Sequence, residues 1–117
     1  MSGSTETAEI CNQLVKLLSD TVPFHAGIIR ATGMAAERDL ASAAPIYQSL
    51  DWWGGAGSIA DEAGEGLQSA QKKRVLELIT DVRDVFHKAG IDYSRADMWA
   101  EVFRGWLRDG VFDQEPS

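Results

Sequence analysis

The stretch that decides the fold is residues 67–89, which read LQSAQKKRVLELITDVRDVFHKA. Its apolar side chains recur at alternating spacings of three and four residues, the periodicity of an amphipathic α-helix. They are Val75, Leu78, Val82, Val85 and Ala89, joined by Ile79 and Phe86. Acidic and basic residues alternate on the opposite face, and Gly90 follows as a helix-ending residue. The stretch therefore predicts a long helix with one face in a hydrophobic core.

The segments around this stretch show the same periodicity. Pro45 interrupts the third segment, so we expect there either a kinked helix or two short helices that meet near Ala44. Residues 59–63 form only a short helix, since Gly64 follows at once. The predicted helices cover residues 5–19, 23–32, 34–51, 59–63, 67–89 and 95–109.

Capping residues mark several of these helix ends. Gly33 suits the left-handed position that ends the second helix. Ser58 can cap the helix at 59–63, with Asp61 as the acid of a capping box. Residues 94–97, Ser-Arg-Ala-Asp, form a second capping box ahead of the last helix, which presents Met98, Trp99, Val102, Phe103 and Trp106 as its apolar face.

These patterns predict an all-α fold, a bundle of five or six helices with a Gly-rich turn at about 54–57. No segment shows the period-two alternation of a strand. At 117 residues the chain is expected to form a single helical domain over 1–117, with flexible ends at 1–4 and 113–117. The predicted core consists of Leu14, Leu18, Ile28, Tyr47, Val75, Leu78, Val82, Phe86, Trp99, Phe103 and Trp106.

Charge is distributed unevenly along the chain. The net charge is −7, and residues 39–71 hold five acidic residues and no basic one. A protein of this charge lacks the basic footprint that phosphate binding requires, so direct nucleic-acid binding is not expected. An acidic surface instead attracts a protein with a basic surface. The alternative is that the acidic side serves solubility alone.

Two adjacent Trp residues run into a Gly-rich box within this acidic stretch. Residues 49–61 read SLDWWGGAGSIAD, and Gly54, Gly55 and Gly57 are expected to form a tight turn, with a positive φ at Gly55 or Gly57. Either one ring of the pair is partly exposed, or both pack over the end of the bundle. The first arrangement has the composition of a binding hot spot. The partner-binding residues predicted on this basis are Asp51, Trp52, Trp53, Asp61, Glu62 and Glu65.

Catalytic and metal-binding patterns are weak in comparison. The Gly box lacks the Lys-Ser or Lys-Thr of a phosphate loop. His25 and His87 stand alone, and Asp81, Asp84 and His87 only partly share a helix face, so no metal site is predicted. Cys11 lies on an apolar face and is expected to be buried. We therefore predict no catalytic residue and no cofactor.

Compartment follows from composition. A single Cys excludes an intramolecular disulfide and fits a reducing compartment. The first residues lack a basic region followed by an apolar one, and no apolar run approaches the length of a membrane span. A cytoplasmic location without membrane contact is expected.

The box also resembles one found in small bacterial helical domains of unknown function. In these, an aromatic residue at a helix end runs into Gly-Gly-small-Gly-Ser-hydrophobic-x-Asp, matched here by Trp53, Gly54, Gly55, Ala56, Gly57, Ser58, Ile59 and Asp61. Glu62 departs from that box, which has an apolar residue at this position. Small acidic helical proteins of this kind often look like immunity proteins that neutralise a toxin encoded beside them, and the resemblance implies that role.

Two hypotheses from different classes remain open. The first is a protein-binding module, an acidic bacterial immunity protein that neutralises a cognate toxin by direct binding. The second is a small helical enzyme or ligand-binding domain with a pocket under Trp52 and Trp53. An enzyme would show convergent acidic or His side chains at a cavity.

Overall fold

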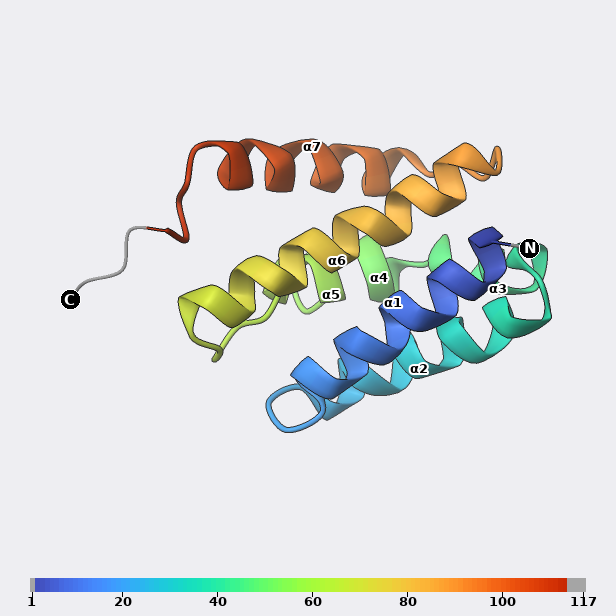
Figure 1. Ribbon diagram of the computed structural model, residues 1–117, viewed down its shortest axis with the longest axis horizontal. Helices are drawn as coiled ribbons and strands as arrows, with labels where there is room; N and C mark the ends of the chain where they lie inside the picture. Colours follow the sequence, from blue (N-terminus) through green and yellow to red (C-terminus); the bar gives the residue numbers. More distant parts are fainter. Residues whose placement is uncertain (1, 114–117) are drawn as a thin grey trace.

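The structure, a computed structural model, describes residues 2–113. Within that range every regular element is a helix and there is no strand. The seven helices (Figure 1) are α1 Ser2–Leu18, α2 Pro23–Arg38, α3 Leu40–Tyr47, α4 Leu50–Trp53, α5 Ile59–Glu62, α6 Ser69–Lys88 and α7 Ser94–Arg108. The all-α prediction is confirmed, although the described part has more helices than the five or six expected.

Helix α6 is the central element of the bundle. Helices α1 and α7 both pack against it, while α1 forms its most extensive contacts with α2 (Figure 1). The short helices α4 and α5 lie behind α6, where α4 also touches α2 and α7. Val75, Leu78, Val82 and Phe86, all predicted from the periodicity, are fully buried. The long amphipathic helix thus supplies the core, as its sequence indicated.

The tight packing of α1 on α2 corrects one predicted boundary. Gly33 does not end a helix, because α2 continues to Arg38. A Cβ added at Gly33 would lie 3.0 Å from the Cβ of Cys11 on α1. Glycine is therefore needed here for the close approach of two helices, not for a left-handed backbone.

A second correction concerns the break in the segment 34–51. The chain breaks at Asp39, which has extended backbone angles and whose carboxylate accepts a hydrogen bond from the Ser42 amide at 2.7 Å. That hydrogen bond lowers the pKa of Asp39. Helix α3 then runs through Pro45, which costs one backbone hydrogen bond. An Asp with a favourable capping geometry outweighs the Pro in setting the boundary.

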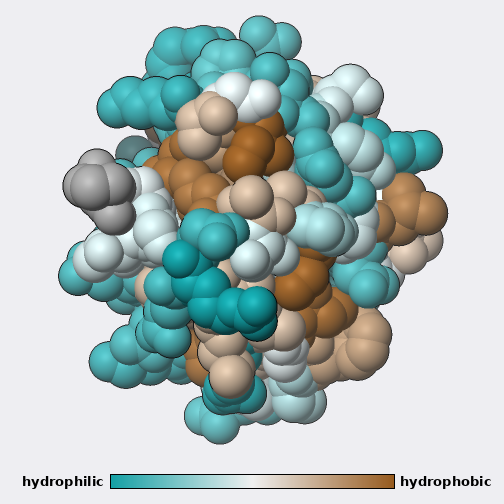
Figure 2. All heavy atoms as spheres, turned by 90° about the vertical axis from the view of Figure 1, so that its right-hand side faces the viewer, coloured by the Kyte–Doolittle hydropathy of each residue, from teal (hydrophilic) through white to brown (hydrophobic). Residues whose placement is uncertain are grey.

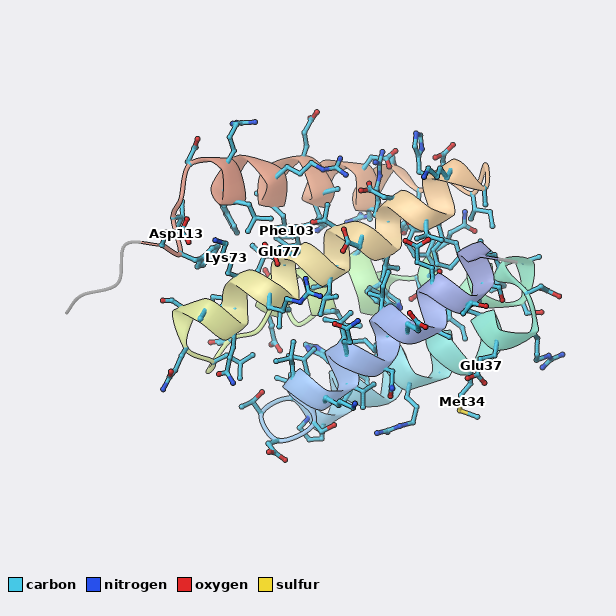
Figure 3. The ribbon with its side chains drawn as sticks, viewed as in Figure 1. Met34, Glu37, Lys73, Glu77, Phe103 and Asp113 are labelled. Carbon is cyan, nitrogen blue, oxygen red and sulfur yellow. The ribbon has the colours of Figure 1, made fainter. Side chains whose placement is uncertain are left out.

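The last helix has its predicted bounds to within one residue, but its cap and part of its apolar face differ from prediction. Its N-cap is Tyr93 instead of the predicted Ser94, and no side chain caps it. The Asp97 carboxylate, predicted as part of a capping box, accepts from Arg83 Nε at 2.9 Å. Phe103 points from α7 toward α6 and is buried (Figure 3). Trp106, predicted as core, is 41% exposed. Helix α7 lies along one side of α6 only, so a single narrow face of it is covered.

The chain ends were expected to be flexible. Residues 2–4 form the first turn of α1, which begins before the predicted Thr5. Residue 1 and residues 114–117 lie outside the described residues. Beyond α7 the chain is tied back by Asp113, whose carboxylate accepts from Lys73 Nζ on α6 at 2.7 Å (Figure 3).

Candidate functional site

Both Trp residues of the box are buried. Helix α4 is a single turn, and its rings Trp52 and Trp53 stack with centroids 5.5 Å apart and an interplanar angle of 25°. Trp52 Nε1 donates to Thr32 Oγ1 on α2 at 2.9 Å. Trp99 Nε1, on α7, donates to the Trp53 carbonyl at 3.2 Å. Neither ring reaches the surface, so the predicted contact of Trp52 or Trp53 with a partner is not available in this structure.

The Trp pair continues into a larger aromatic cluster. Tyr47 at the end of α3 stacks on Phe86 of α6, with centroids 4.0 Å apart, and meets Trp53 edge-on at 5.7 Å. Burial raises the pKa of the Tyr47 hydroxyl. The cluster joins α3, α4 and α6 at the point where α2 and α7 also contact the box. The aromatic residues of the box therefore hold the fold together.

The glycines after the Trp pair let the chain turn between α4 and α5. A Cβ on Gly54 would lie 2.5 Å from the Leu50 carbonyl oxygen, and Gly57 has a φ of 87°. Ser58 then caps α5: its Oγ accepts from the Asp61 amide at 3.0 Å and donates to the Gly54 carbonyl at 2.7 Å. Asp61 reaches back to the Gly57 amide at 3.1 Å. The loop is held by its own polar groups.

A buried His, for which the sequence predicted no role, also holds this loop. Nε2 of His25, in the first turn of α2, lies 2.9 Å from the Gly57 carbonyl and 3.5 Å from Glu62 Oε1. Since both neighbours are acceptors, the geometry assigns the proton to Nε2, which donates to the Gly57 carbonyl. The signal available in the sequence was only a His among apolar residues. Its partner is 32 positions away, so local patterns could not identify it.

The predicted acids, unlike the Trp rings, are accessible. Asp51 on α4, Asp61 on α5 and Glu65 in the turn after α5 are exposed, and Glu62 is half-buried. We call these four residues the α4–α5 acids. Within residues 2–113, no basic nitrogen lies within 4.0 Å of a carboxylate of Asp51, Asp61 or Glu65. Their charge is not compensated by ion pairs.

Two exposed apolar side chains accompany the α4–α5 acids. Phe24 is 70% exposed, and its ring centroid lies 6.1 Å from that of His25, which contacts Glu62. Leu50 is exposed beside Asp51 at the start of α4. Phe24 is thus an exposed aromatic residue whose neighbour His25 contacts one of the acids, Glu62.

Two grooves of the surface are lined by residues outside the box. One, of about 580 Å³, runs between α1 and α2 and is lined by Cys11, Arg30 and Met34. Another, of about 600 Å³, lies between the start of α1 and the ends of α2 and α6. Neither is lined by Trp52 or Trp53. Burial raises the pKa of the Cys11 thiol to about 12, which keeps it protonated and poorly nucleophilic.

One cluster of possible metal ligands forms where α6 passes into α7. His87, Asp92 and Asp97 each place a ligand atom within 4.8 Å of the others. Arg83 already binds Asp97, and His87 Nδ1 lies 2.5 Å from Asp92 Oδ1. The three possible ligands are therefore already engaged, His87 with Asp92 and Asp97 with Arg83. Hydrophilic side chains cover much of this end of the molecule, with hydrophobic patches between them (Figure 2).

Comparison with known proteins identifies no relative. No protein-family model matches the chain, and neither a curated protein nor a solved structure matches it significantly. Among the described residues, no helix is long and apolar enough to cross a membrane.

Proposed function

We propose that this protein is a protein-binding module whose α4–α5 acids dock on a basic surface of a partner. In its most concrete form, it is an immunity protein that neutralises a cognate toxin by covering a basic active-site cleft. The single observation that carries the proposal is the exposed, unpaired state of Asp51, Asp61 and Glu65 in a stretch without any basic residue.

Electrostatic complementarity of this kind acts mainly on the rate at which the two proteins associate. Unpaired carboxylates at a surface attract a basic partner over about a Debye length and raise the association rate. Paired acids would contribute less, because the neighbouring cation cancels their field. The acids of α6, such as Glu77 and Asp84, are paired in this way with Arg74, Arg83 and Arg104. The α4–α5 acids are therefore better placed to attract a basic partner.

Phe24 supplies the apolar contact that a stable complex needs. Interfaces commonly combine a central aromatic anchor with a polar rim, and the anchor governs dissociation. Phe24 is held next to the loop by His25, which contacts both Gly57 and Glu62. In this proposal Phe24 is the exposed aromatic contact that the sequence predicted for a Trp ring.

Binding kinetics with the product of the adjacent gene provide the test. The side chains of Asp51 and Glu65 make no hydrogen bond in the loop, so the double variant Asp51→Lys/Glu65→Lys is expected to keep the fold. Its association rate at low salt should fall about 10-fold or more, whereas Phe24→Ala should speed dissociation about 10-fold or more. Wild-type association should also slow steeply as salt rises.

The matched control is Glu9→Lys, an exposed acid on α1. It should change association about 3-fold or less, because it lies outside the proposed interface. If neither Asp51→Lys/Glu65→Lys nor Phe24→Ala changed the binding rates, the interface would lie elsewhere. Absence of any complex with the adjacent gene product would contradict the immunity role.

A further inference from the structure

The apolar face of α7 that the fold leaves uncovered forms a regular strip. Met98, Val102 and Trp106 follow one another at four-residue spacing and are 53%, 37% and 41% exposed. The covered face of the same helix consists of Ala96, Ala100 and Phe103. Helix α7 therefore has two apolar faces, of which α6 covers only one.

Charged residues complete the strip at both ends. Arg95 lies seven residues before Val102 and Asp109 seven residues after it, and both are exposed. Because an α-helix turns about 100° per residue, Arg95, Met98, Val102, Trp106 and Asp109 fall within a sector about 80° wide. Arg95 has no ion-pair partner within 4.0 Å among residues 2–113, and Asp109 has only its neighbour Arg108, at 3.8 Å.

The strip is complementary to itself when reversed about Val102. Two antiparallel copies crossing at this residue would bring Met98 against Trp106 of the second copy, and Trp106 against Met98. Arg95 would meet Asp109 at one end, and Asp109 would meet Arg95 at the other. Sulfur–aromatic contacts and opposite charges are both favourable pairings. A parallel arrangement would instead oppose like charges at both ends.

We propose that this strip is a homodimer interface, in which α7 of one copy packs antiparallel against α7 of a second copy, with Val102 at the twofold axis. The two ion pairs between Arg95 and Asp109 set the orientation, and the apolar residues exclude water. A single pair of helices buries less area than a permanent dimer requires, so the affinity is expected in the micromolar range, roughly 1–100 µM. The interface is separate from the α4–α5 acids and does not depend on the proposed partner.

Sedimentation equilibrium of the full chain across that concentration range is the first experiment. A monomer–dimer equilibrium is expected for the wild-type protein. Val102→Glu places two carboxylates together at the axis and should abolish the dimer over the same range. A wild-type chain that remains monomeric at the highest concentration, or forms larger open assemblies, would overturn the proposal.

A charge-swap cycle tests the orientation. Arg95→Glu and Asp109→Arg should each weaken dimerisation about 10-fold, because each creates two like-charge contacts. The double variant restores opposite charges and should return to within about 3-fold of the wild type. The control Glu101→Arg changes a charge on α7 outside the strip and should have little effect. If the double variant lost as much dimerisation free energy as the two single variants together, the antiparallel register would be excluded.

Cross-linking provides an independent test of the position of the twofold axis. The chain has one Cys, which is buried, so an introduced thiol is the only accessible one within the described part. Val102→Cys should form a symmetric disulfide on mild oxidation. Met34→Cys, on the exposed side of α2 (Figure 3), should react far more slowly. Equal rates for both variants would contradict a twofold axis at Val102.

Discussion

The Trp-Trp-Gly-Gly box and helix α7 show opposite relations between sequence pattern and exposure. The box has no helical periodicity, runs into glycines, and yet buries both Trp rings completely. Helix α7 has a regular amphipathic pattern and leaves Trp106 exposed. Five elements meet at the box, α2, α3, α4, α6 and α7, whereas α7 rests mainly on α6. Burial thus follows the number of covering elements, which the local pattern does not contain.

Truncation of the Trp residues tests this comparison most strongly. Trp53→Ala should lower the free energy of unfolding by about 3–5 kcal/mol, because a large cavity opens among rigid neighbours. Trp106→Ala should cost less than about 1 kcal/mol, since water already reaches that ring. Urea denaturation followed by circular dichroism, at a protein concentration low enough to keep the chain monomeric, measures both. Similar losses in the two variants would mean that α7 is covered in solution.

Two glycines of α2 allow the same comparison between a covered and an uncovered position, with a smaller expected change in stability. Gly33 faces α1 at close range, whereas a Cβ at Gly27 would meet nothing within 4 Å. Gly33→Ala should destabilise the protein by about 1–3 kcal/mol through overpacking against Cys11. Gly27→Ala should stabilise it by about 0.5–1 kcal/mol, because alanine favours the helix. The same denaturation experiment checks the sign, and two stabilised variants would show that α1 and α2 are not tightly packed.

The smallest effect is expected at the turn of the box. Gly57 has a φ of 87°, where an L-residue is strained, and Gly57→Ala should cost about 1–2 kcal/mol. Gly55, exposed and free of close contacts, is the matched control, and Gly55→Ala should change stability by less than about 0.5 kcal/mol. Thermal unfolding of the two variants side by side measures the difference. Equal stabilities would show that the turn adapts to a side chain.

Periodicity predicted the elements of this fold better than their boundaries. Helix α6 was expected at 67–89 and is found at Ser69–Lys88, because its pattern repeats over many turns. The Ser58 cap was also predicted, since its partner is three residues away. The end of α2 at Arg38 was missed because the role of Gly33 depends on Cys11, which is distant in sequence. Asp97 was taken for a capping residue because its partner, Arg83, belongs to another helix.

The candidate site divides in the same way. The exposure of Asp51, Asp61 and Glu65 agrees with their charge, which keeps such groups in water. Trp52 Nε1 donates to Thr32, 20 positions away, and His25, the neighbour of Phe24, contacts Gly57, 32 positions away. Neither contact can be predicted from the spacing of residues along the chain. In the proposed interface, Phe24 therefore takes the place of the buried Trp pair.

The shortness of α4 has a consequence for the order of folding. A helix of four residues has no more than one turn, and nucleation is too unfavourable for it to form alone. Its two Trp rings contact Thr32 and Tyr47, and Tyr47 in turn stacks on Phe86. We therefore expect the frame of α1, α2 and α6 to assemble first and the box to close afterwards. In kinetic terms, truncations within the box should speed unfolding while leaving the rate of folding almost unchanged.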